Sequence, residues 1–238
     1  SAFNEMLDTV EEVFIHEKQF STDVSHELRT PVSVILAHSD YALNYTETLK
    51  EAMESFEVIN RQAEKMKNLI NQIMELSKLE RQKEIEKERI NFSNIILELL
   101  TDYKTLLELD EEKKINLIID VEKDLRIYGN RLMLERVFIN LFTNAMKFTE
   151  TMISVSLKKI NKKVILQIKD DGIGISKTDQ KYIWNRFFQT SDSRNKDKNK
   201  GSGLGLSMVN RIVQLHSATI EVESEVGEGA CFIVKFPI

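Results

Sequence analysis

The sequence is poor in cysteine, proline and glycine. Its 238 residues include one cysteine (Cys231), two prolines and eight glycines. A single cysteine excludes an internal disulfide, and we expect Cys231 to be a small buried residue in a strand near the C-terminus. Proline and glycine interrupt helices and strands, so their scarcity predicts long regular elements. The length predicts one or two domains.

Long apolar runs and a surplus of positive charge are missing as well. No stretch is apolar enough to cross a bilayer and no signal peptide opens the sequence, so we expect that this piece is not secreted. The net charge of −5 gives no electrostatic footprint for nucleic acid, and we expect no nucleic-acid partner. With 42% hydrophobic and 30% charged residues, the composition is that of a soluble globular protein.

The first 85 residues contain no glycine and show two heptad patterns, separated by turn and cap residues at 44–48. They predict a helical hairpin. One hairpin has too few layers to bury its seam, whereas two hairpins form a homodimeric four-helix bundle. A coiled-coil spacer is the alternative, and it also predicts a dimer. The seam positions are Phe3, Leu7, Val10, Phe14, Val24, Leu28, Pro31, Ile35 and Ala42, then Leu49, Ala52, Phe56, Ile59, Ala63, Met66, Ile70 and Ile73.

Pro31 stands inside the first helical pattern, where a proline costs about 3 kcal/mol because it removes a backbone hydrogen bond. On a helical wheel it falls on the apolar stripe, so its ring is expected to pack inside. We expect a bend at this turn that works as a hinge.

His26 falls on the opposite side of the same helix, about 200° from Val24 on the wheel. An exposed neutral imidazole is a competent nucleophile toward phosphorus, and the neighbouring Glu27 carboxylate can accept its ring proton. Thr30 lies one turn further on the same side, where its hydroxyl can position a water. The alternative is an ordinary solvated helix face.

The charged run 80–89 ends the helical part, and strands then alternate with helices. This order predicts an α/β sandwich of roughly 150 residues, large enough to fold alone. The expected strands are 115–121, 152–159, 164–170, 219–224 and 230–236, and the expected helices are 92–109, 130–148, 178–187 and 204–215.

The predicted helix 130–148 carries Asn140, Asn144 and Lys147 at spacings of four and three residues. Amide oxygens suit Mg²⁺, and a nearby ammonium suits phosphate. Asp170 ends an apolar strand and opens "DDGIGI", whose glycines permit close approach of a ligand. Its carboxylate can bind an exocyclic amine.

A second glycine cluster, "GSGLGL" at 201–206, opens a helix whose free N–H groups favour phosphate. It is neither the dinucleotide fingerprint nor a P-loop, and a tight turn is the alternative for each cluster. The polar segment 187–200 is expected to form a mobile lid over the phosphates, or else a solvated loop. Its candidate phosphate contacts are Arg194, Lys196, Lys198 and Lys200.

Five motifs in this order closely resemble the cytoplasmic part of sensor histidine kinases of two-component systems. They are "SHELRTP" (25–31, H box), "NLFTNAMKF" (140–148, N box), "DDGIG" (170–174, G1 box), "RFFQ" (186–189, F box) and "GSGLGL" (201–206, G2 box). The resemblance covers essentially the whole chain. It implies an all-α helical hairpin for dimerisation and histidine phosphotransfer at 17–85, followed by an α/β sandwich of the Bergerat (GHKL) ATP-binding type at 86–238.

The resemblance also implies roles for individual residues. His26 is the phosphoacceptor, Glu27 the base that assists it, and Thr30 the residue that supports dephosphorylation of the partner. The cofactors implied are ATP and Mg²⁺. The ATP site consists of Asn144 as Mg²⁺ ligand, Asn140 and Lys147 near the phosphates, Asp170 at the adenine amino group, and Gly172, Gly174, Gly201, Gly203 and Gly205 around the pocket and lid hinges.

Two departures from the family pattern concern the F and G1 boxes. Phe188 and Gln189 stand where many members have Tyr and Arg, which leaves phosphate contact to Arg186 or the lid lysines. Asp171 stands where Asn or Thr is frequent, and we expect little effect from it.

The implied activity is ATP-dependent autophosphorylation of His26, phosphoryl transfer to an aspartate of a response regulator, and phosphatase activity toward that regulator. Residues 1–16 resemble the end of a HAMP linker. We therefore expect a cytoplasmic fragment of a cell-membrane receptor, tied to the membrane only through N-terminal segments absent here.

Two alternatives remain. A hydrolytic Bergerat ATPase clamp would carry a water-activating glutamate where Asn140 stands. A non-catalytic nucleotide-binding dimer scaffold would bind ATP without chemistry.

Overall fold

The computed structural model describes the backbone of residues 2–109, 114–190 and 201–238, and side chains from residue 19 to 107 and in the later two ranges. The chain divides into two compact units, 1–75 and 76–238, each described here by itself. The lid residues Arg194, Lys196, Lys198 and Lys200 lie outside the described residues. No helix within the described ranges combines the length and the apolar character that a bilayer span requires.

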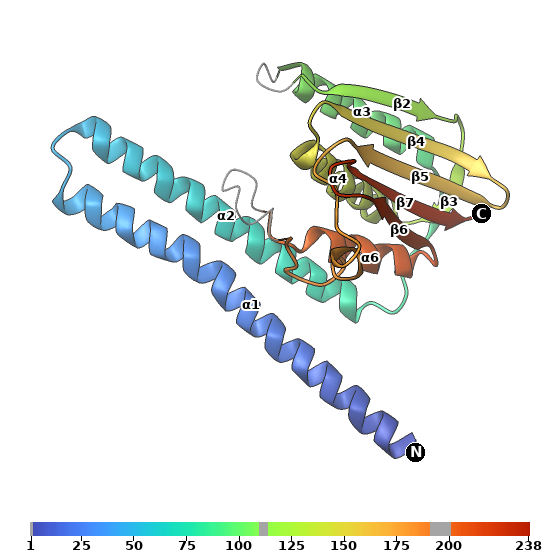
Figure 1. Cartoon of the computed structure of the whole chain (residues 1–238), viewed down its shortest axis with the longest axis horizontal. Helices are drawn as coiled ribbons and strands as arrows, with labels where there is room; N and C mark the ends of the chain where they lie inside the picture. Colours follow the sequence, from blue (N-terminus) through green and yellow to red (C-terminus); the bar gives the residue numbers. More distant parts are fainter. Residues whose placement is uncertain (1, 110–113, 191–200) are drawn as a thin grey trace. The chain divides into compact units, whose positions relative to one another are not determined.

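The first unit is a helical hairpin of α1 (Ala2–Asn44) and α2 (Leu49–Arg81), as the heptad patterns predict (Figure 1). A capping box starts α2. The Glu51 carboxylate accepts the backbone N–H of Glu47 at 3.0 Å, and the Thr48 hydroxyl oxygen accepts the N–H of Glu51 at 3.3 Å. The turn between the helices therefore ends on residues that favour a new helix.

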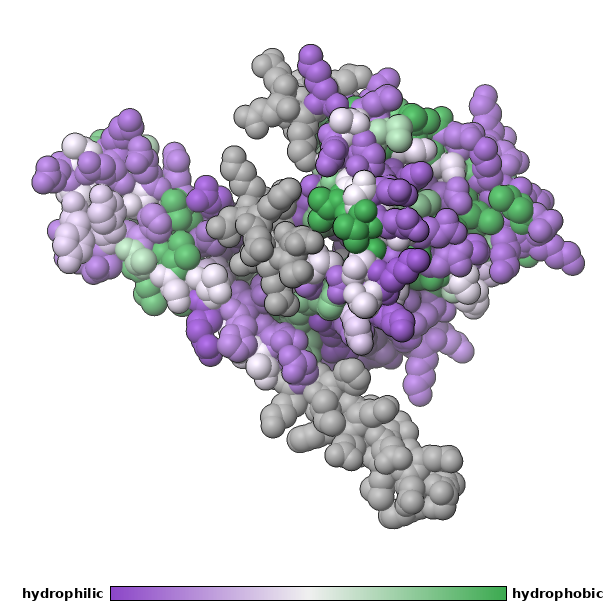
Figure 2. Space-filling model, in the orientation of Figure 1, coloured by the Kyte–Doolittle hydropathy of each residue, from purple (hydrophilic) through white to green (hydrophobic). Residues whose placement is uncertain are grey.

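The two apolar series of α2 differ in burial. Ala52, Ile59, Met66 and Ile73 are half-buried. In the other series, Leu49 is 78% exposed and Phe56 60% exposed. Figure 2 shows hydrophobic surface of this kind on the hairpin, among hydrophilic residues. A single hairpin thus leaves one of the two apolar series of α2 uncovered.

The second unit is a two-layer α/β sandwich. Its main sheet has the order β2-β4-β5-β7-β6, in which β2 and β4 are parallel and the other neighbours antiparallel. The short strands β1 and β3 form a separate antiparallel pair. The bounds are β1 Glu88–Asn91, α3 Phe92–Leu109, β2 Asn116–Val121, β3 Arg126–Gly129, α4 Arg131–Phe148, β4 Met152–Ile160, β5 Lys163–Asp170, the 3₁₀ helix η1 Asp179–Lys181, α6 Gly205–Leu215, β6 Thr219–Ser224 and β7 Ala230–Pro237.

The helices α3, α4 and α6 cover one face of the main sheet (Figure 1). Side chains alternate along each strand, so every second residue faces this helical layer. The resulting core includes Phe138 and Leu141 of α4 against Val155 of β4 and Leu166 of β5, all fully buried. The opposite face is polar and carries ion pairs such as Lys158–Asp120.

Three sequence-based expectations need correction. The predicted helix 178–187 is only the three-residue η1 followed by turns, because 3₁₀-type hydrogen bonds such as Tyr182 N–H to the carbonyl of Asp179 replace the α-helical pattern. The strands β1 and β3 were not predicted, since four residues are too few to show alternation. Cys231 is half-buried on the outer face of β7, not in the core.

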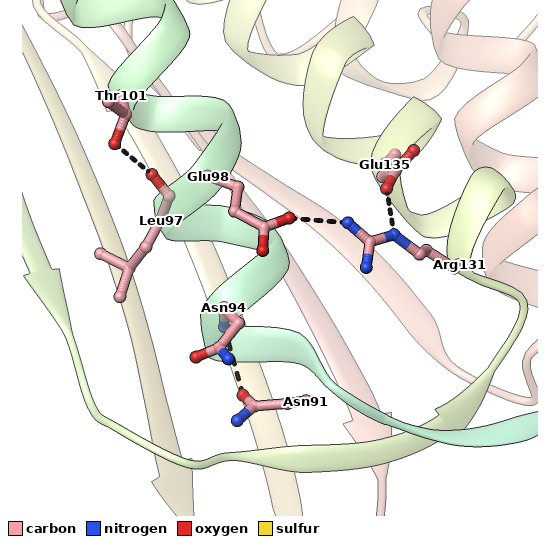
Figure 3. A network of polar contacts seen from close by, with 7 residues as sticks. All are labelled: Asn91, Asn94, Leu97, Glu98, Thr101, Arg131 and Glu135. Atoms are coloured by element: carbon pink, nitrogen blue, oxygen red, sulfur yellow. Dashed lines mark hydrogen bonds and ion pairs between the residues drawn. The ribbon is translucent and has the colours of Figure 1, made fainter.

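Surface polar contacts tie the starts of α3 and α4 together (Figure 3). The Arg131 guanidinium contacts the Glu98 carboxylate at 2.6 Å and the Glu135 carboxylate at 2.7 Å. The hydrogen bonds that Arg131 donates to Glu135 and Glu98 raise its pKa. Arg131 and Glu98 are exposed, so the pair between them contributes little to stability. At the start of α3 the Asn91 side chain accepts the N–H of Asn94 at 3.2 Å.

Candidate active site

His26 is exposed on α1, as the helical wheel predicts, with Glu27 half-buried beside it. The Thr30 hydroxyl donates to the carbonyl oxygen of His26 at 3.5 Å, a long bond that leaves the hydroxyl easily turned. Pro31 is buried, and α1 continues through it. The reactive candidates therefore share one stretch of continuous helix around a buried proline. The hinge at Pro31 stays a prediction.

The helix α4 is anchored at its start by a buried histidine from the end of α6. Asn130 is the N-cap, and its side chain accepts the N–H of Met133 at 3.2 Å. The His216 Nε2 atom accepts the backbone N–H of Asn130 at 3.0 Å, while its Nδ1 lies 2.8 Å from the carbonyl oxygen of Ile212. His216 is 3% exposed, and this burial lowers its pKa. His216 thus links the start of α4, which carries the N box, to the end of α6, which follows the G2 box.

Asn140 and Lys147 of α4 face the second glycine cluster. The Asn140 amide donates to the carbonyl of Arg136 at 2.9 Å, and a Cβ atom at Gly205 would lie 2.7 Å from its Oδ1. A Cβ atom at Gly201 would lie 3.3 Å from the Lys147 Nζ. Burial lowers the pKa of the Lys147 ammonium, which also lies over the ring of Phe148. The structure therefore brings the N and G2 boxes together, as the sequence predicts.

Asn144, the candidate Mg²⁺ ligand, is half-buried one turn after Asn140. Within the described ranges no cluster of three or more His, Cys, Asp or Glu side chains could hold a metal ion. Mg²⁺ often binds through few protein oxygens together with substrate phosphates and water. A single amide oxygen beside a phosphate site fits that mode.

Asp170 ends β5 and is 5% exposed. Its Oδ1 accepts the N–H groups of Gly172 at 2.9 Å and Ala230 at 3.3 Å. Burial raises the pKa of this carboxyl, although these hydrogen bonds act in the opposite direction. Asp170 is therefore a buried, fixed acceptor at the end of the sheet.

The glycines of the G1 box allow close backbone packing. A Cβ atom at Gly172 would overlap the carbonyl oxygen of Phe148, the last residue of α4. Gly174 has a positive φ of 69°, and a Cβ atom there would overlap the carbonyl oxygen of Glu225. The loop thus runs directly against the end of the N-box helix, which the sequence order alone does not reveal.

Asp171 makes more structural contacts than the sequence indicated. Its carboxylate accepts hydrogen bonds from the hydroxyls of Thr149 at 2.7 Å and Thr151 at 2.6 Å, and from the backbone N–H of Glu150 at 2.9 Å. Burial alone would raise the pKa of Asp171, but the hydrogen bonds from Thr149 and Thr151 outweigh it and hold the pKa well below its usual range. Sequence analysis noted the residue only as a departure from the family pattern.

The turn between β6 and β7 also supports the G1 box, and sequence analysis missed it. A Cβ atom at Gly229 would overlap the carbonyl oxygen of Asp170. The Ser224 hydroxyl accepts the N–H of Ile175 at 2.8 Å and donates to the carbonyl of Gly229 at 2.6 Å. The Gln180 amide donates to the carbonyl of Ile175 at 2.9 Å. The glycines near 227–229 were the only signal, and they indicate no more than a turn.

The F box lies against the G2 box. Phe187 donates its backbone N–H to the carbonyl of Gly203 at 3.0 Å, and both residues have positive φ angles, 59° and 71°. The Gln189 side chain, in the place of the frequent Arg, donates to the carbonyl of Gly201 at 2.8 Å. The described residues just before and just after 191–200 therefore bond to each other.

Arg186 is paired with Glu80, in the last turn of α2, which belongs to the second unit from Leu76 onward. Arg211 of α6 donates to the carbonyls of Leu79 at 3.1 Å and of Gln82. The structure thus places Arg186 beside Glu80, and its proposed contact with phosphate stays a prediction.

Comparisons with known proteins agree with this geometry. Residues 129–238 match the family model described as histidine kinase-, DNA gyrase B-, and HSP90-like ATPase, and residues 16–82 match the His Kinase A (phospho-acceptor) domain. The domain boundaries 17–85 and 86–238 expected from the sequence stay predictions.

Relatives of similar sequence share these parts. The sensor histidine kinase YclK of Bacillus subtilis is 30% identical over 97% of this chain and 49% of its own length. The signal transduction histidine-protein kinase ArlS of Staphylococcus aureus is 30% identical over 99% of this chain and 52% of its own length. The chain thus spans about half the length of these two relatives.

Solved structures share the fold. The Acinetobacter baumannii histidine kinase AdeS superimposes with a TM-score of 0.70 at 22% identity, covering 89% of this chain and 97% of its own. The histidine kinase ThkA, solved in complex with the response regulator TrrA, gives a TM-score of 0.76 at 21% identity, covering 95% of this chain and 63% of its own. At such identities these structures support the fold alone.

Proposed function

The chain belongs to the sensor histidine kinases of two-component systems, and on that premise we propose that it phosphorylates His26 with ATP and passes the phosphoryl group to an aspartate of a response regulator. One observation carries the proposal most. Asn140 meets Gly205, Lys147 meets Gly201, and the end of the same helix meets Gly172. Three motifs distant in sequence thus meet at one helix, which supports the proposal that together they bind a nucleotide.

Each end of ATP has candidate partners there. Both N–H groups that Asp170 accepts reach Oδ1, so Oδ2 is the oxygen that would accept the adenine amino group. Lys147 would lie against the phosphates, and Asn144 would hold Mg²⁺. The metal would supply neutralisation of phosphate charge. Asn140, Gly174, Gly203 and Arg186 complete the proposed site.

The chemistry at His26 is a phosphoryl transfer. A neutral ring nitrogen attacks the γ-phosphorus, an N–P bond forms, and the P–O bond to ADP breaks. Glu27 accepts the proton from the other ring nitrogen and orients the ring. The exposure of His26 allows a macromolecular ATP site and a response regulator to reach it in turn.

We propose that Thr30 serves the reverse function, dephosphorylation of the regulator. Among the residues that the structure describes, its hydroxyl bonds only the carbonyl of His26, at 3.5 Å, so it can turn to position a water. The homodimer would form through the exposed apolar series of α2. We further propose that the chain is the cytoplasmic fragment of a cell-membrane receptor, with 1–16 as the end of a HAMP linker.

An ATPase clamp would need a general base at the position of Asn140, whose amide cannot accept a proton. A nucleotide-binding scaffold would need no reactive histidine.

In the discriminating experiment, the unmodified chain and the variants His26→Gln and His16→Gln are each incubated with γ-labelled ATP and Mg²⁺. His16→Gln is the control on the same helix. The proposal predicts acid-labile, alkali-stable label in the chain and in His16→Gln, and none in His26→Gln. Turnover that survives His26→Gln supports the clamp, and neither label nor turnover supports the scaffold.

A further inference from the structure

Asp171 joins the two ends of the candidate ATP site. We propose that it is a positioning residue that holds the adenine loop at a fixed distance from the phosphate-binding helix α4. This inference rests on the proposed assignment of Asp170 to adenine and of Asn144 and Lys147 to the phosphate end.

Four donors converge on the Asp171 carboxylate. Oδ1 accepts the Thr149 hydroxyl at 2.7 Å and the N–H groups of Glu150 at 2.9 Å and Thr151 at 3.1 Å. Oδ2 accepts the Thr151 hydroxyl at 2.6 Å. The Thr149 hydroxyl also lies 2.9 Å from the carbonyl of Met152, but its single proton favours the shorter, charged acceptor. An ionised carboxylate is acceptor-only and matches this all-donor environment.

The donors lie directly after α4. Thr149 is the C-cap of this helix and donates its N–H to the carbonyl of Ala145 at 2.8 Å. The preceding turn carries Lys147 and Asn144. On the other side, Asp171 is the immediate neighbour of Asp170. Its carboxylate is therefore a direct bridge between the residues assigned to the two ends of one ligand.

The charged form is stable here, because the hydrogen bonds hold the pKa of Asp171 well below its usual range. An asparagine could keep the three bonds of Oδ1. It would turn its NH₂ group toward the Thr151 hydroxyl, which can rotate to accept, and would lose the 3.2 Å bond from the Thr151 N–H to Oδ2. An alanine would lose all of them. Asp171→Asn is thus a conservative variant and Asp171→Ala a disruptive one.

A positioning role predicts a ligand-dependent effect. Adenosine occupies only the adenine end, whereas ATP must reach both ends at once. If the bridge sets their separation, its loss weakens the ligand that spans both ends and spares the short one.

The test measures binding of adenosine and of ATP with Mg²⁺ to the whole chain, well below its unfolding temperature. We expect Asp171→Ala to bind ATP about tenfold more weakly, or about 1.4 kcal/mol, and adenosine within about twofold. Asp171→Asn should restore most of the ATP affinity. Asp120→Ala, which removes an acidic partner of Lys158 on the outer face of the sheet, is the matched control and should bind both normally.

Equal losses for both ligands, or no loss for either, would overturn the positioning role. Thr151→Val removes one donor but keeps the shape, so it gives the same test with a smaller effect if Asp171→Ala does not fold. Asp170→Asn tests the adenine assignment separately from the positioning role of Asp171. If it binds adenosine normally, the proposed adenine site fails; if it loses adenosine while Asp171→Ala is normal, only the bridge fails.

Discussion

At the residue scale, the role of a side chain can be predicted from the sequence more readily when the side chain is proposed to contact the ligand than when it holds other parts of the protein in place. Asn140 and Lys147 were singled out because their spacing and chemistry suit a phosphate site, and the structure places them beside Gly205 and Gly201. Their contact with phosphate stays a prediction. The role of Asp171 was underestimated because its hydrogen-bond partners, Thr149 and Thr151, are distant in the sequence and come close only in the folded chain. Residues proposed to bind the ligand lie close together in the sequence as a recognisable motif, whereas the residues that hold the backbone of the site in place do not.

Asp170→Asn should separate binding from stability. Burial raises the pKa of Asp170, so the ionised carboxylate costs folding free energy, and this cost grows as pH rises through the folded pKa. We expect the neutral variant without nucleotide to unfold at pH 7 at the same temperature as the unmodified chain or a higher one. ATP affinity should fall by about tenfold or more, since a charged hydrogen bond is lost. Calorimetry of unfolding and of ATP binding checks both.

The same raised pKa gives ATP binding an acidic limb. In the unmodified chain affinity should decline as pH falls through a pKa above the ordinary Asp value of about 3.9. This decline should be absent from Asp170→Asn. An identical pH profile for both proteins would argue against the adenine assignment.

Gly203→Ala tests the contact between the F and G2 boxes. Gly203 has a φ of 71°, and a Cβ atom would lie 2.7 Å from the backbone of Phe187. Left-handed backbone costs an alanine about 1–2 kcal/mol. Gly227→Ala is the matched control, because Gly227 has a φ of 84° but nothing within 4 Å of a Cβ atom. We expect both variants to lose some stability, and only Gly203→Ala to lose ATP affinity; equal ATP affinities would show that the contact does not shape the site.

At the element scale, long amphipathic helices were predicted well and short elements were not. The bounds of α4 differ from the predicted 130–148 only because Asn130 is its N-cap. The predicted helix 178–187 failed because tertiary contacts outweigh local propensity there. Ile183 is buried, Gln180 donates to the G1 loop, and Phe187 takes a positive φ to meet Gly203.

His216 gives the element scale a pH-dependent test. Burial lowers the pKa of this histidine, so its neutral form stabilises the fold above the unfolded pKa of about 6.5. That contribution is lost as pH falls from there toward the lower folded pKa. We expect His216→Gln to lose about 1–3 kcal/mol at pH 7, because the N–H of Asn130 loses its acceptor. Denaturant unfolding at pH 7 and pH 5 should show a smaller difference between the two proteins at pH 5; a difference that grows would contradict this role.

At the scale of the whole molecule, the proposed phosphoacceptor and the proposed nucleotide site lie in different units of the chain. The hairpin carries His26 and the exposed apolar series, and the sandwich carries the nucleotide motifs. The sequence predicted a helical hairpin followed by an α/β sandwich, because heptad spacing and strand alternation are long-range patterns that survive local irregularity. The structure adds the burial of each residue, which shows which of the two apolar series of α2 is exposed and could contact a second copy of the chain.

Phe56→Glu tests the dimer. Phe56 is 60% exposed in the single chain, and a charge there would be buried without a partner in a four-helix bundle. We expect the variant to be largely monomeric, by light scattering, at concentrations where the unmodified chain is a dimer. Glu57→Gln, on the neighbouring exposed position, should stay dimeric. A dimeric Phe56→Glu would place the interface elsewhere.

The most direct measurement of the central claim is the position of the phosphate. The chain is incubated with ATP and Mg²⁺, kept at alkaline pH, digested, and analysed by mass spectrometry. The account predicts phosphate on His26, in the peptide 19–29 that trypsin releases. Phosphate on another residue, or ATP turnover that leaves His26 unmodified, would contradict it.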